Sequence, residues 1–324
     1  MKAIRVHAFG GVDALQFQDV DDPVPSPGEA LVRIHAAGVN PVDTYISAGI
    51  YARLPDLPFI PGIDGAGVIE SVGHGVASLT VGQRVYVSGS MAGNIGDCYA
   101  EKAVCPESAL FPLPDAASFA AGAAIGIPYA TAYQALFGRG RAKPGETVFV
   151  HGASGAVGTA TVHLARAHGL TVIGSAGSER GRSLVEEQGA QHVLDHTTDD
   201  YIGILRDFTG TNGPNVIIEM LANANLVKDL SVIGQSGRIV IVGNRGTIEI
   251  NPRDAMGRDI DVLGMVLWNC GDRELRSIHA ALIAGLENGT LNPVIGREFP
   301  LAEAGAAHTT VMEPGAYGKI VLVP

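Results

Sequence analysis

The chain has 324 residues, of which 46% are hydrophobic and 17% are charged, so it can form about two domains with a sizeable core. Its net charge of −11 argues against a general nucleic-acid binder and against a protein of anionic membrane surfaces. No apolar run approaches the roughly 18 residues of a membrane span, and three cysteines form no disulfide framework, so we expect a cytoplasmic protein.

The first 120 residues predict a domain built from short strands. Apolar or alternating runs of strand length, separated by Gly/Pro turns, cover residues 1–9, 31–37, 67–72, 83–88 and 99–104. Many short strands between turn signals favour a small β-barrel. Residues 115–137 then predict a helical connector, in which Pro128 marks a helix start or a kink.

The segment from Asn40 to Tyr51 contains polar residues that could meet a substrate. Asn40-Pro41 initiates a turn at a predicted loop-to-helix junction. The hydroxyl of Tyr45 can donate a hydrogen bond to a carbonyl while its ring lines an apolar pocket. Asn40 and Tyr45 are therefore candidate substrate-side donors. From the residues alone, the alternative stays open that Tyr45 and Tyr51 are packing residues and that Asn40 only forms the turn.

A glycine loop in the middle of the chain is its most informative motif. The apolar strand Val148–Val150 runs into Gly152, Gly155 and Gly158, and a helical pattern follows over residues 159–168. Glycines let the backbone approach a pyrophosphate, and the next helix offers free N–H groups and a positive dipole end. Glycine triplets also occur in ordinary turns, so the elements after the loop decide its meaning.

Those elements alternate between strands and helices. Apolar runs of strand length cover residues 171–174, 192–194, 216–218 and 238–242. Helical patterns between them cover residues 182–189, 200–208 and 226–234. This alternation predicts βαβ units in a doubly wound parallel sheet, and hence an α/β fold. Residues 318–323 predict one more strand, which we expect to return to the first domain.

The second strand of this sheet bears on the choice of dinucleotide. It ends in Ser175, where NAD-binding folds usually carry Asp or Glu for the ribose 2′-hydroxyl. Arg180 and Arg182 follow at a predicted helix start, where cations oppose the helix dipole and where guanidinium groups could pair with a 2′-phosphate. The pattern favours NADPH over NADH. The alternative is two solvated arginines behind Ser178 as N-cap, and Glu179 also disagrees with the phosphate interpretation.

The sequence predicts no metal site and no serine nucleophile. Zinc needs several Cys, His or carboxylate ligands brought together. Cys98 and Cys105 are seven residues apart without any Cys-x-x-Cys, while His192 and His196 fall on either side of a predicted strand end. No Gly-x-Ser-x-Gly elbow is present outside or inside the glycine loop, which argues against a serine hydrolase.

Five sets of motifs together point to a family. They cover residues 40–45, 61–70, 123–133, 151–158, and 217–226 with 243–254. Over essentially the full length, the chain resembles the zeta-crystallin-like quinone reductases, the zinc-independent branch of the medium-chain dehydrogenase/reductase superfamily. Zinc enzymes of the superfamily carry Gly-His-Glu where this chain has Gly62-Ile63-Asp64, and this chain lacks their four-cysteine lobe. The resemblance therefore agrees with the expected absence of a metal.

The resemblance implies the domains and the residues that bind the cofactor. It implies a GroES-like β-barrel catalytic domain from residues 1–122 and 266–324, and a Rossmann NADPH-binding domain from residues 123–265. Some relatives carry a lysine near the 2′-phosphate where this chain has Gly181 between two arginines, so which arginine replaces it stays open. With the three residues from the phosphate argument, the expected NADPH contacts are Tyr51, Ser154, Gly155, Ala156, Val157, Gly177, Ser178, Arg180, Arg182, His196, Asn225, Val242, Gly243, Asn244, Arg245, Met265, Val266 and Leu267.

The activity implied by the resemblance is NADPH-dependent reduction of a small-molecule quinone, without metal. Tyr45 or Asn40 would hydrogen-bond the quinone carbonyl and solvent would supply protons; net one-electron transfer that releases a semiquinone stays open. One alternative is an NADPH-dependent enone or alkenal reductase. Another is a non-enzymatic NADPH-binding protein with a structural or RNA-binding role, although the acidic balance counts against RNA. We also expect a homodimer or homotetramer, with the apolar strand Asp261–Trp268 as the candidate sheet edge.

Overall fold

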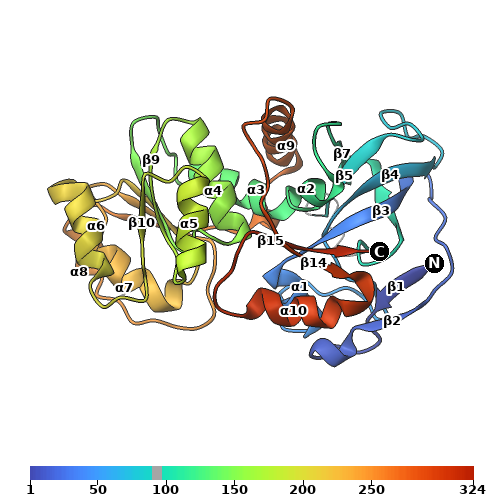
Figure 1. Cartoon of the computed structure of the whole chain (residues 1–324), viewed down its shortest axis with the longest axis horizontal. Helices are drawn as coiled ribbons and strands as arrows, with labels where there is room; N and C mark the ends of the chain where they lie inside the picture. Colours follow the sequence, from blue (N-terminus) through green and yellow to red (C-terminus); the bar gives the residue numbers. More distant parts are fainter. Residues whose placement is uncertain (90–96) are drawn as a thin grey trace. The chain divides into compact units, whose positions relative to one another are not determined.

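A computed structural model describes residues 1–89 and 97–324 of the chain. The chain divides into two compact units, and Figure 1 labels most of their helices and strands. The first unit consists of Met1–Ile127, Gly271–Pro314 and Gly318–Pro324, and the second of Pro128–Cys270 and Gly315–Tyr317. None of the helices in the described residues is long and apolar enough to cross a membrane.

The first unit is built around a bent sheet. Its strands are β1 (Lys2–Arg5), β2 (Gln16–Asp19), β3 (Glu29–Val39), β4 (Asp64–Val72), β5 (Arg84–Ser88), β6 (Lys102–Pro106), β7 (Leu110–Pro112), β14 (Ile295–Pro300) and β15 (Lys319–Val323). The main sheet has the order β14-β15-β3-β4-β5-β7, with β6 paired to β3, while β1 and β2 form a separate pair. Two register shifts between β3 and β4 bend the sheet. The last strand pairs with β3, which confirms its expected return to the first domain.

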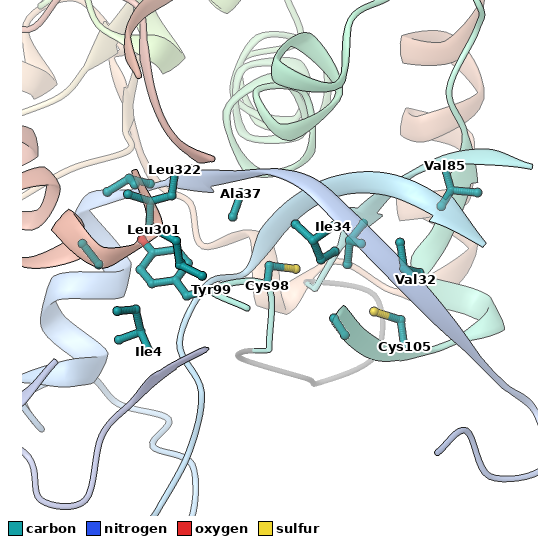
Figure 2. Close-up of a cluster of buried hydrophobic side chains, with 14 of the residues drawn as sticks. Ile4, Val32, Ile34, Ala37, Val85, Cys98, Tyr99, Cys105, Leu301 and Leu322 are labelled. Atoms are coloured by element: carbon teal, nitrogen blue, oxygen red, sulfur yellow. The ribbon is translucent and has the colours of Figure 1, made fainter. Parts of the chain in front are cut away.

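Segments from both ends of the sequence share the core of this unit. Figure 2 shows Ile4 from β1 and Leu322 from β15 in the same buried cluster as Tyr99. Gly62 has φ +98°, and a Cβ there would come within 2.2 Å of Tyr99 Cδ1, so only glycine fits. The packing of this ring therefore places the start of β4, which carries Asp64.

A buried ion pair, the Lys319–Asp64 junction, joins four segments of the first unit. Lys319 Nζ lies 3.0 Å from Asp64 Oδ2 and 2.5 Å from Asn40 Oδ1. Asn40 Nδ2 donates to Asp64 Oδ2 at 2.9 Å, and the N–H of Ile127 donates to Asp64 Oδ1 at 2.8 Å. The Lys319 and Asp64 side chains are only 2% and 0% exposed. Because water cannot replace a lost partner, each group depends on the others for its hydrogen bonds.

The predicted helical connector is broken rather than continuous. The helices of the first unit are α1 (Pro41–Ser47), α2 (Phe119–Ala123), α9 (Asp272–Glu287) and α10 (Ala304–Met312), and α3 (Gly126–Tyr133) crosses into the second unit. Within the connector, α2 ends before α3 begins, and a π-helical turn over Gln134–Arg139 follows. Pro128 lies in the first turn of α3, where its missing N–H costs no hydrogen bond. Pro128 thus marks a helix start.

The second unit is a doubly wound parallel sheet, as predicted. Its elements are β8 (Thr147–Val150), α4 (Ala156–Ala167), β9 (Thr171–Ser175), α5 (Glu179–Glu187), β10 (His192–Leu194), α6 (Tyr201–Thr209), β11 (Val216–Glu219), α7 (Ala222–Val232), β12 (Arg238–Ile241), α8 (Arg253–Met256) and β13 (Asp261–Gly264). In Figure 1, α4 and α5 lie on one side of the sheet and α6 and α7 on the other. Helices on both faces explain why strand residues such as Phe149 and Ile217 are fully buried.

The strand order of this sheet identifies where a ligand binds. Its parallel strands run β10-β9-β8-β11-β12-β13, which is the 3-2-1-4-5-6 order of dinucleotide-binding sheets. The order reverses between β8 and β11, and such sheets bind ligands at the carboxyl ends of the strands beside that point. One expectation was too long: the edge strand β13 ends at Gly264, and Leu267–Asn269 form a separate 3-10 turn.

Replacing Lys319 with methionine should destabilise the first unit by about 3–5 kcal/mol, because Asp64 then stays buried without its cation. The double variant Asp64→Asn/Lys319→Met should recover part of this loss, because it removes both charges. Urea unfolding of the purified variants measures both effects. The exposed pair between Lys2 and Asp19 supplies the control, since Lys2→Met should leave the unfolding midpoint nearly unchanged. Equal effects of the two lysine variants would contradict the importance of the junction.

Candidate functional site

The glycine loop joins β8 to α4 at the carboxyl end of the second unit's sheet. Gly152 has φ +54°, a left-handed conformation that glycine adopts readily. A Cβ on Gly158 would lie 2.4 Å from the carbonyl oxygen of Gly152 and 2.6 Å from Cα of Ala153, so the first turn of α4 packs directly on the loop. A Cβ on Gly155, the N-cap of α4, would meet nothing closer than 3.5 Å. Gly152 and Gly158 therefore fix the shape of the loop.

The start of α4 offers backbone donors for a phosphate. Ala156 and Val157 are its first helical residues, and N–H groups in a first turn have no partner within the helix. The positive end of the helix dipole adds to their attraction for an anion. The hydroxyl of Ser154 points elsewhere, since it donates to the carbonyl of Ala316 at 2.7 Å.

Three predicted contacts, Gly177, Ser178 and His196, follow the ends of β9 and β10. The buried Ser175 closes β9 without a carboxylate. His196 Nδ1 lies 3.4 Å from Ser175 Oγ, and a Cβ on Gly177 would come within 2.8 Å of His196 Nε2. Burial lowers the pKa of His196, which keeps its ring neutral near pH 7. Ser178 is the N-cap of α5, because its Oγ accepts the N–H of Gly181 at 3.1 Å.

The two candidate arginines differ in their contacts. Arg182 Nη1 forms an ion pair with Asp195 Oδ2 at 2.6 Å. Arg180 is exposed, and its guanidinium carbon lies 3.9 Å from the centre of the Tyr317 ring. Among the described residues, none forms a hydrogen bond or an ion pair with the Arg180 guanidinium group, so the stacking on Tyr317 is the contact that holds it.

The start of α7, directly after β11, and the loop after β12 are tied to each other. They carry five predicted contacts: Asn225, Val242, Gly243, Asn244 and Arg245. The N–H of Asn223 donates to Asn244 Oδ1 at 3.0 Å, and the N–H of Arg245 donates to Asn223 Oδ1 at 2.9 Å. A Cβ on Gly243 would lie 2.2 Å from the carbonyl oxygen of Met220, so the two backbones touch. The structure thus brings these residues together.

The last predicted contacts in this unit, Met265, Val266 and Leu267, follow β13. The N–H of Met265 donates to the carbonyl of Ile241 at 3.1 Å, which continues the pairing of β12 with β13. Leu267 is buried, whereas Val266 is 48% exposed. All predicted cofactor residues of the second unit therefore lie beyond the carboxyl ends of its strands, where the strand order places a ligand.

His151, Glu219 and Asp229 form a buried cluster at the point where the strand order reverses. His151 follows β8, Glu219 ends β11, and Asp229 lies in α7. His151 Nε2 lies 2.7 Å from Asp229 Oδ1 and 3.3 Å from Glu219 Oε2. Glu219 Oε1 accepts the N–H of Leu221 and also Nδ2 of Asn225, the latter at 3.2 Å. The cluster thus orients one of the predicted cofactor residues.

Burial controls the ionisation of this cluster. It raises the pKa of Glu219 and that of Asp229 to about 7, and it lowers the pKa of His151. Two carboxyl groups so close together in a dry site do not both ionise readily. Near neutral pH, the cluster therefore favours a neutral imidazole and a proton on its carboxyl pair.

The same three side chains could be considered as metal ligands, since their ligand atoms lie within 4.8 Å of one another. However, the 2.7 Å from His151 Nε2 to Asp229 Oδ1 is a hydrogen-bond distance. Two ligands on a tetrahedral zinc ion with bonds near 2.0 Å would lie about 3.3 Å apart. We therefore interpret the cluster as hydrogen-bonded.

In the first unit, Asn40, Tyr45 and Tyr51 lie along α1 and the loop behind it. Asn40 precedes α1, and its N–H donates to Asp43 Oδ2 at 2.8 Å. Its amide is 4% exposed and held in the Lys319–Asp64 junction, so Asn40 has a structural task. Tyr45 and Tyr51 are half-buried. Their placement permits the substrate-side interpretation and the packing interpretation alike.

Sequence reasoning missed the buried charges and Tyr317. Lys319 and Glu219 each occupy one end of an apolar strand, and such residues are rarely fully buried unless they have partners. A charged residue at the end of an apolar strand was therefore the feature of the sequence that could have indicated a buried ion pair. The partners themselves are far away in the sequence, so the pattern of residues did not identify them.

The strand order, the glycine loop and the uncharged end of β9 define a dinucleotide-dependent oxidoreductase. Residues 26–115 match the family described as "Alcohol dehydrogenase GroES-like domain", and residues 156–283 match "Zinc-binding dehydrogenase". Quinone oxidoreductase of Rattus norvegicus is 47% identical, and that of Homo sapiens 45% identical, over 100% of this chain and 98% of each relative. A crystal structure of Escherichia coli quinone oxidoreductase complexed with NADPH has a TM-score of 0.87 and 25% identity, covering 100% of both chains. The chain belongs to the quinone oxidoreductase family of the medium-chain dehydrogenase/reductase superfamily.

The buried carboxyl pair predicts a pH-dependent stability. Burial raises the pKa of Glu219 from 4.5 to about 7 in the folded state, so the protonated carboxyl group stabilises the folded protein. This contribution to the free energy of unfolding is fully present below about pH 4 and is lost as the pH rises through 7. Between pH 5 and pH 7, the free energy of unfolding should fall by about 1.4 kcal/mol per pH unit relative to Glu219→Gln, which does not titrate. Urea unfolding at several pH values measures this difference.

The matched control for this experiment is the exposed Glu187 at the end of α5. Glu187→Gln should run parallel to the unchanged protein over the same range of pH. A Glu219→Gln profile that also ran parallel to it would contradict the shared-proton interpretation.

Proposed function

We propose that this chain is an NADPH-dependent quinone oxidoreductase that needs no metal. The observation that carries the proposal is the identity of 45–47% over the full chain to relatives named quinone oxidoreductase. Identity over the full length includes both units, so it applies to the acceptor side as well as to the nucleotide side. We further propose that residues 123–265 form the NADPH-binding domain, and that residues 1–122 and 266–324 form the catalytic domain.

The second unit fits the proposed cofactor. The N–H groups of Ala156 and Val157 would hold the pyrophosphate. The first turn of α7, with Asn225, and the loop with Asn244 would contact the rest of the nucleotide. The end of β9 at Ser175 supplies no carboxylate to repel a 2′-phosphate, which supports NADPH. When bound, this cofactor supplies the reducing equivalents, so the protein has to bind, orient and exclude water.

On the acceptor side, we propose that Tyr45 donates its phenolic hydrogen to a carbonyl of the quinone. A donor at this oxygen stabilises the negative charge that develops during reduction. Asn40 donates one amide hydrogen to Asp64, which leaves its second amide hydrogen for a weaker auxiliary role. No buried general acid is required, because solvent can protonate the reduced quinone.

The proposed function is tested by following the oxidation of NADPH and NADH separately, with an ortho-quinone and with an alkenal as acceptors. Turnover should require NADPH and the quinone. Turnover with the alkenal alone would move the activity to double-bond reduction, and tight NADPH binding without any turnover would favour a non-enzymatic role. In the same assay, Tyr45→Phe should lower kcat about tenfold or more while leaving the Kd for NADPH unchanged. Full activity of both Tyr45→Phe and Asn40→Ala would exclude the proposed donors.

We also propose that the chain forms a homodimer through the edge of the second unit's sheet. Among the strands that the structure describes, the edge strand β13 pairs on one side only, with β12, and such edges pair readily with another chain. Exposed apolar side chains lie on it and beside it: Val262 at 39%, Val266 at 48% and Met256 at 72%. Their exposure supports the burial of this edge in an assembly.

Sedimentation at micromolar concentration should therefore show a dimer or a tetramer. Val262→Lys should shift the assembly towards monomer, because a buried charge opposes association. The control is Val81→Lys, at an apolar residue of the first unit that is 65% exposed, and it should leave the assembly intact. A monomeric unchanged protein would rule the proposal out.

A further inference from the structure

A short segment late in the chain packs against the nucleotide-binding elements. Gly315–Tyr317 belongs to the second unit, although the residues before and after it belong to the first. The carbonyl of Ala316 accepts the hydroxyl of Ser154 from the glycine loop at 2.7 Å. A Cβ on Gly155 would lie 3.5 Å from Cβ of Ala316, in ordinary van der Waals contact. The segment is therefore held against the glycine loop by a hydrogen bond and by packing.

The next residue of the segment holds Arg180. The guanidinium carbon of Arg180 lies 3.9 Å from the centre of the Tyr317 ring, which is a cation–π contact. Stacking uses the flat face of the guanidinium group and leaves its N–H donors, which point outward in the plane, available. A phosphate is recognised by those in-plane donors. The contact with Tyr317 thus orders Arg180 without occupying the groups that would bind a phosphate.

Arg182, the other candidate, is committed elsewhere. Its Nη1 donates to Asp195 Oδ2 at 2.6 Å, and Oδ1 of the same carboxylate accepts the hydroxyl of Thr197 at 2.6 Å. To bind a phosphate, Arg182 would have to leave a carboxylate. Its position is better explained by neutralising Asp195, which would otherwise repel a phosphate nearby.

The residue after Arg180 is Gly181, which lies beside two serine hydroxyls. A Cβ on Gly181 would lie 3.0 Å from Ser178 Oγ and 3.2 Å from Ser154 Oγ, so both hydroxyl oxygens lie close to the backbone of the first turn of α5. Any side chain at Gly181 would crowd them. Glycine at this position therefore keeps the region between the two serines free.

We propose that Tyr317 is a positioning residue that sets the preference for NADPH over NADH, by holding Arg180 ready to bind the 2′-phosphate. The proposal rests on the proposed NADPH-dependent function. It assigns the phosphate contact to Arg180 rather than to Arg182, and it makes the Gly315–Tyr317 segment part of the cofactor site.

The test compares Tyr317→Leu, which removes the aromatic ring, with Tyr317→Phe, which keeps it. Fluorescence titration gives the Kd of each variant for NADPH and for NADH. Tyr317→Leu should raise the Kd for NADPH about fivefold and leave that for NADH unchanged, whereas Tyr317→Phe should match the unchanged protein. Arg180→Leu should weaken NADPH binding further, and adding Tyr317→Leu to it should have no additional effect, because the two residues act as a unit.

Several results would overturn the proposal. If Tyr317→Leu weakens NADPH and NADH equally, the ring only supports the fold of the site. If the unchanged protein prefers NADPH and Tyr317→Leu retains that preference, the assignment to Tyr317 fails while the proposed function stands. If the unchanged protein binds both nucleotides equally, the NADPH assignment and the role of Tyr317 fail together.

Discussion

The first unit depends on one ammonium group buried beside one carboxylate. The Lys319–Asp64 junction binds the start of β15, the start of β4, the residue that precedes α1 and the first turn of α3. These segments are far apart in the sequence, and the junction ties them together in addition to the pairing of β15 and β4 with β3. The carboxylate of Asp64 is neutralised by a cation that is covalently part of the chain, so this ion pair is fixed by the fold itself.

The second unit shows the same physical constraint at the carboxyl edge of its sheet. The strands of this sheet are buried on both faces, so their polar residues lie at the strand ends. Because the strands are parallel, Ser175, Glu219 and the loop after β12 lie along the same edge of the sheet. Glu219 is drawn into this edge by His151 and Asp229, and it in turn holds Asn225 and the beginning of α7. The buried cluster of His151, Glu219 and Asp229 therefore orients residues at this edge of the sheet without having to contact a ligand itself.

The sequence allowed the periodic features to be predicted and did not reveal the partners of buried charges. The glycine loop and the alternation of strands with helices follow local rules, so the doubly wound sheet and the N-cap at Ser178 could be predicted. The break between α2 and α3 could not, because Asp64 from a distant strand accepts the N–H of Ile127 at the start of α3. The roles of Lys319 and Tyr317 could not be predicted for the same reason, because the partner of each lies more than 100 positions away in the sequence. The expected edge strand was too long because apolar character continues beyond the last residue that pairs with β12.

The position of β15 also bears on how the chain acquires its structure during synthesis. This strand lies between β14 and β3, well inside the sheet, yet it is translated after the whole of residues 128–270. The second unit can fold as soon as its own residues have left the ribosome, since domains fold as units. The first unit has to wait, with the flank of β3 unpaired and Asp64 without its cation, until residue 319 emerges. An unpaired apolar strand is prone to aggregation, so the vulnerable period of this protein is the interval between the completion of the two units.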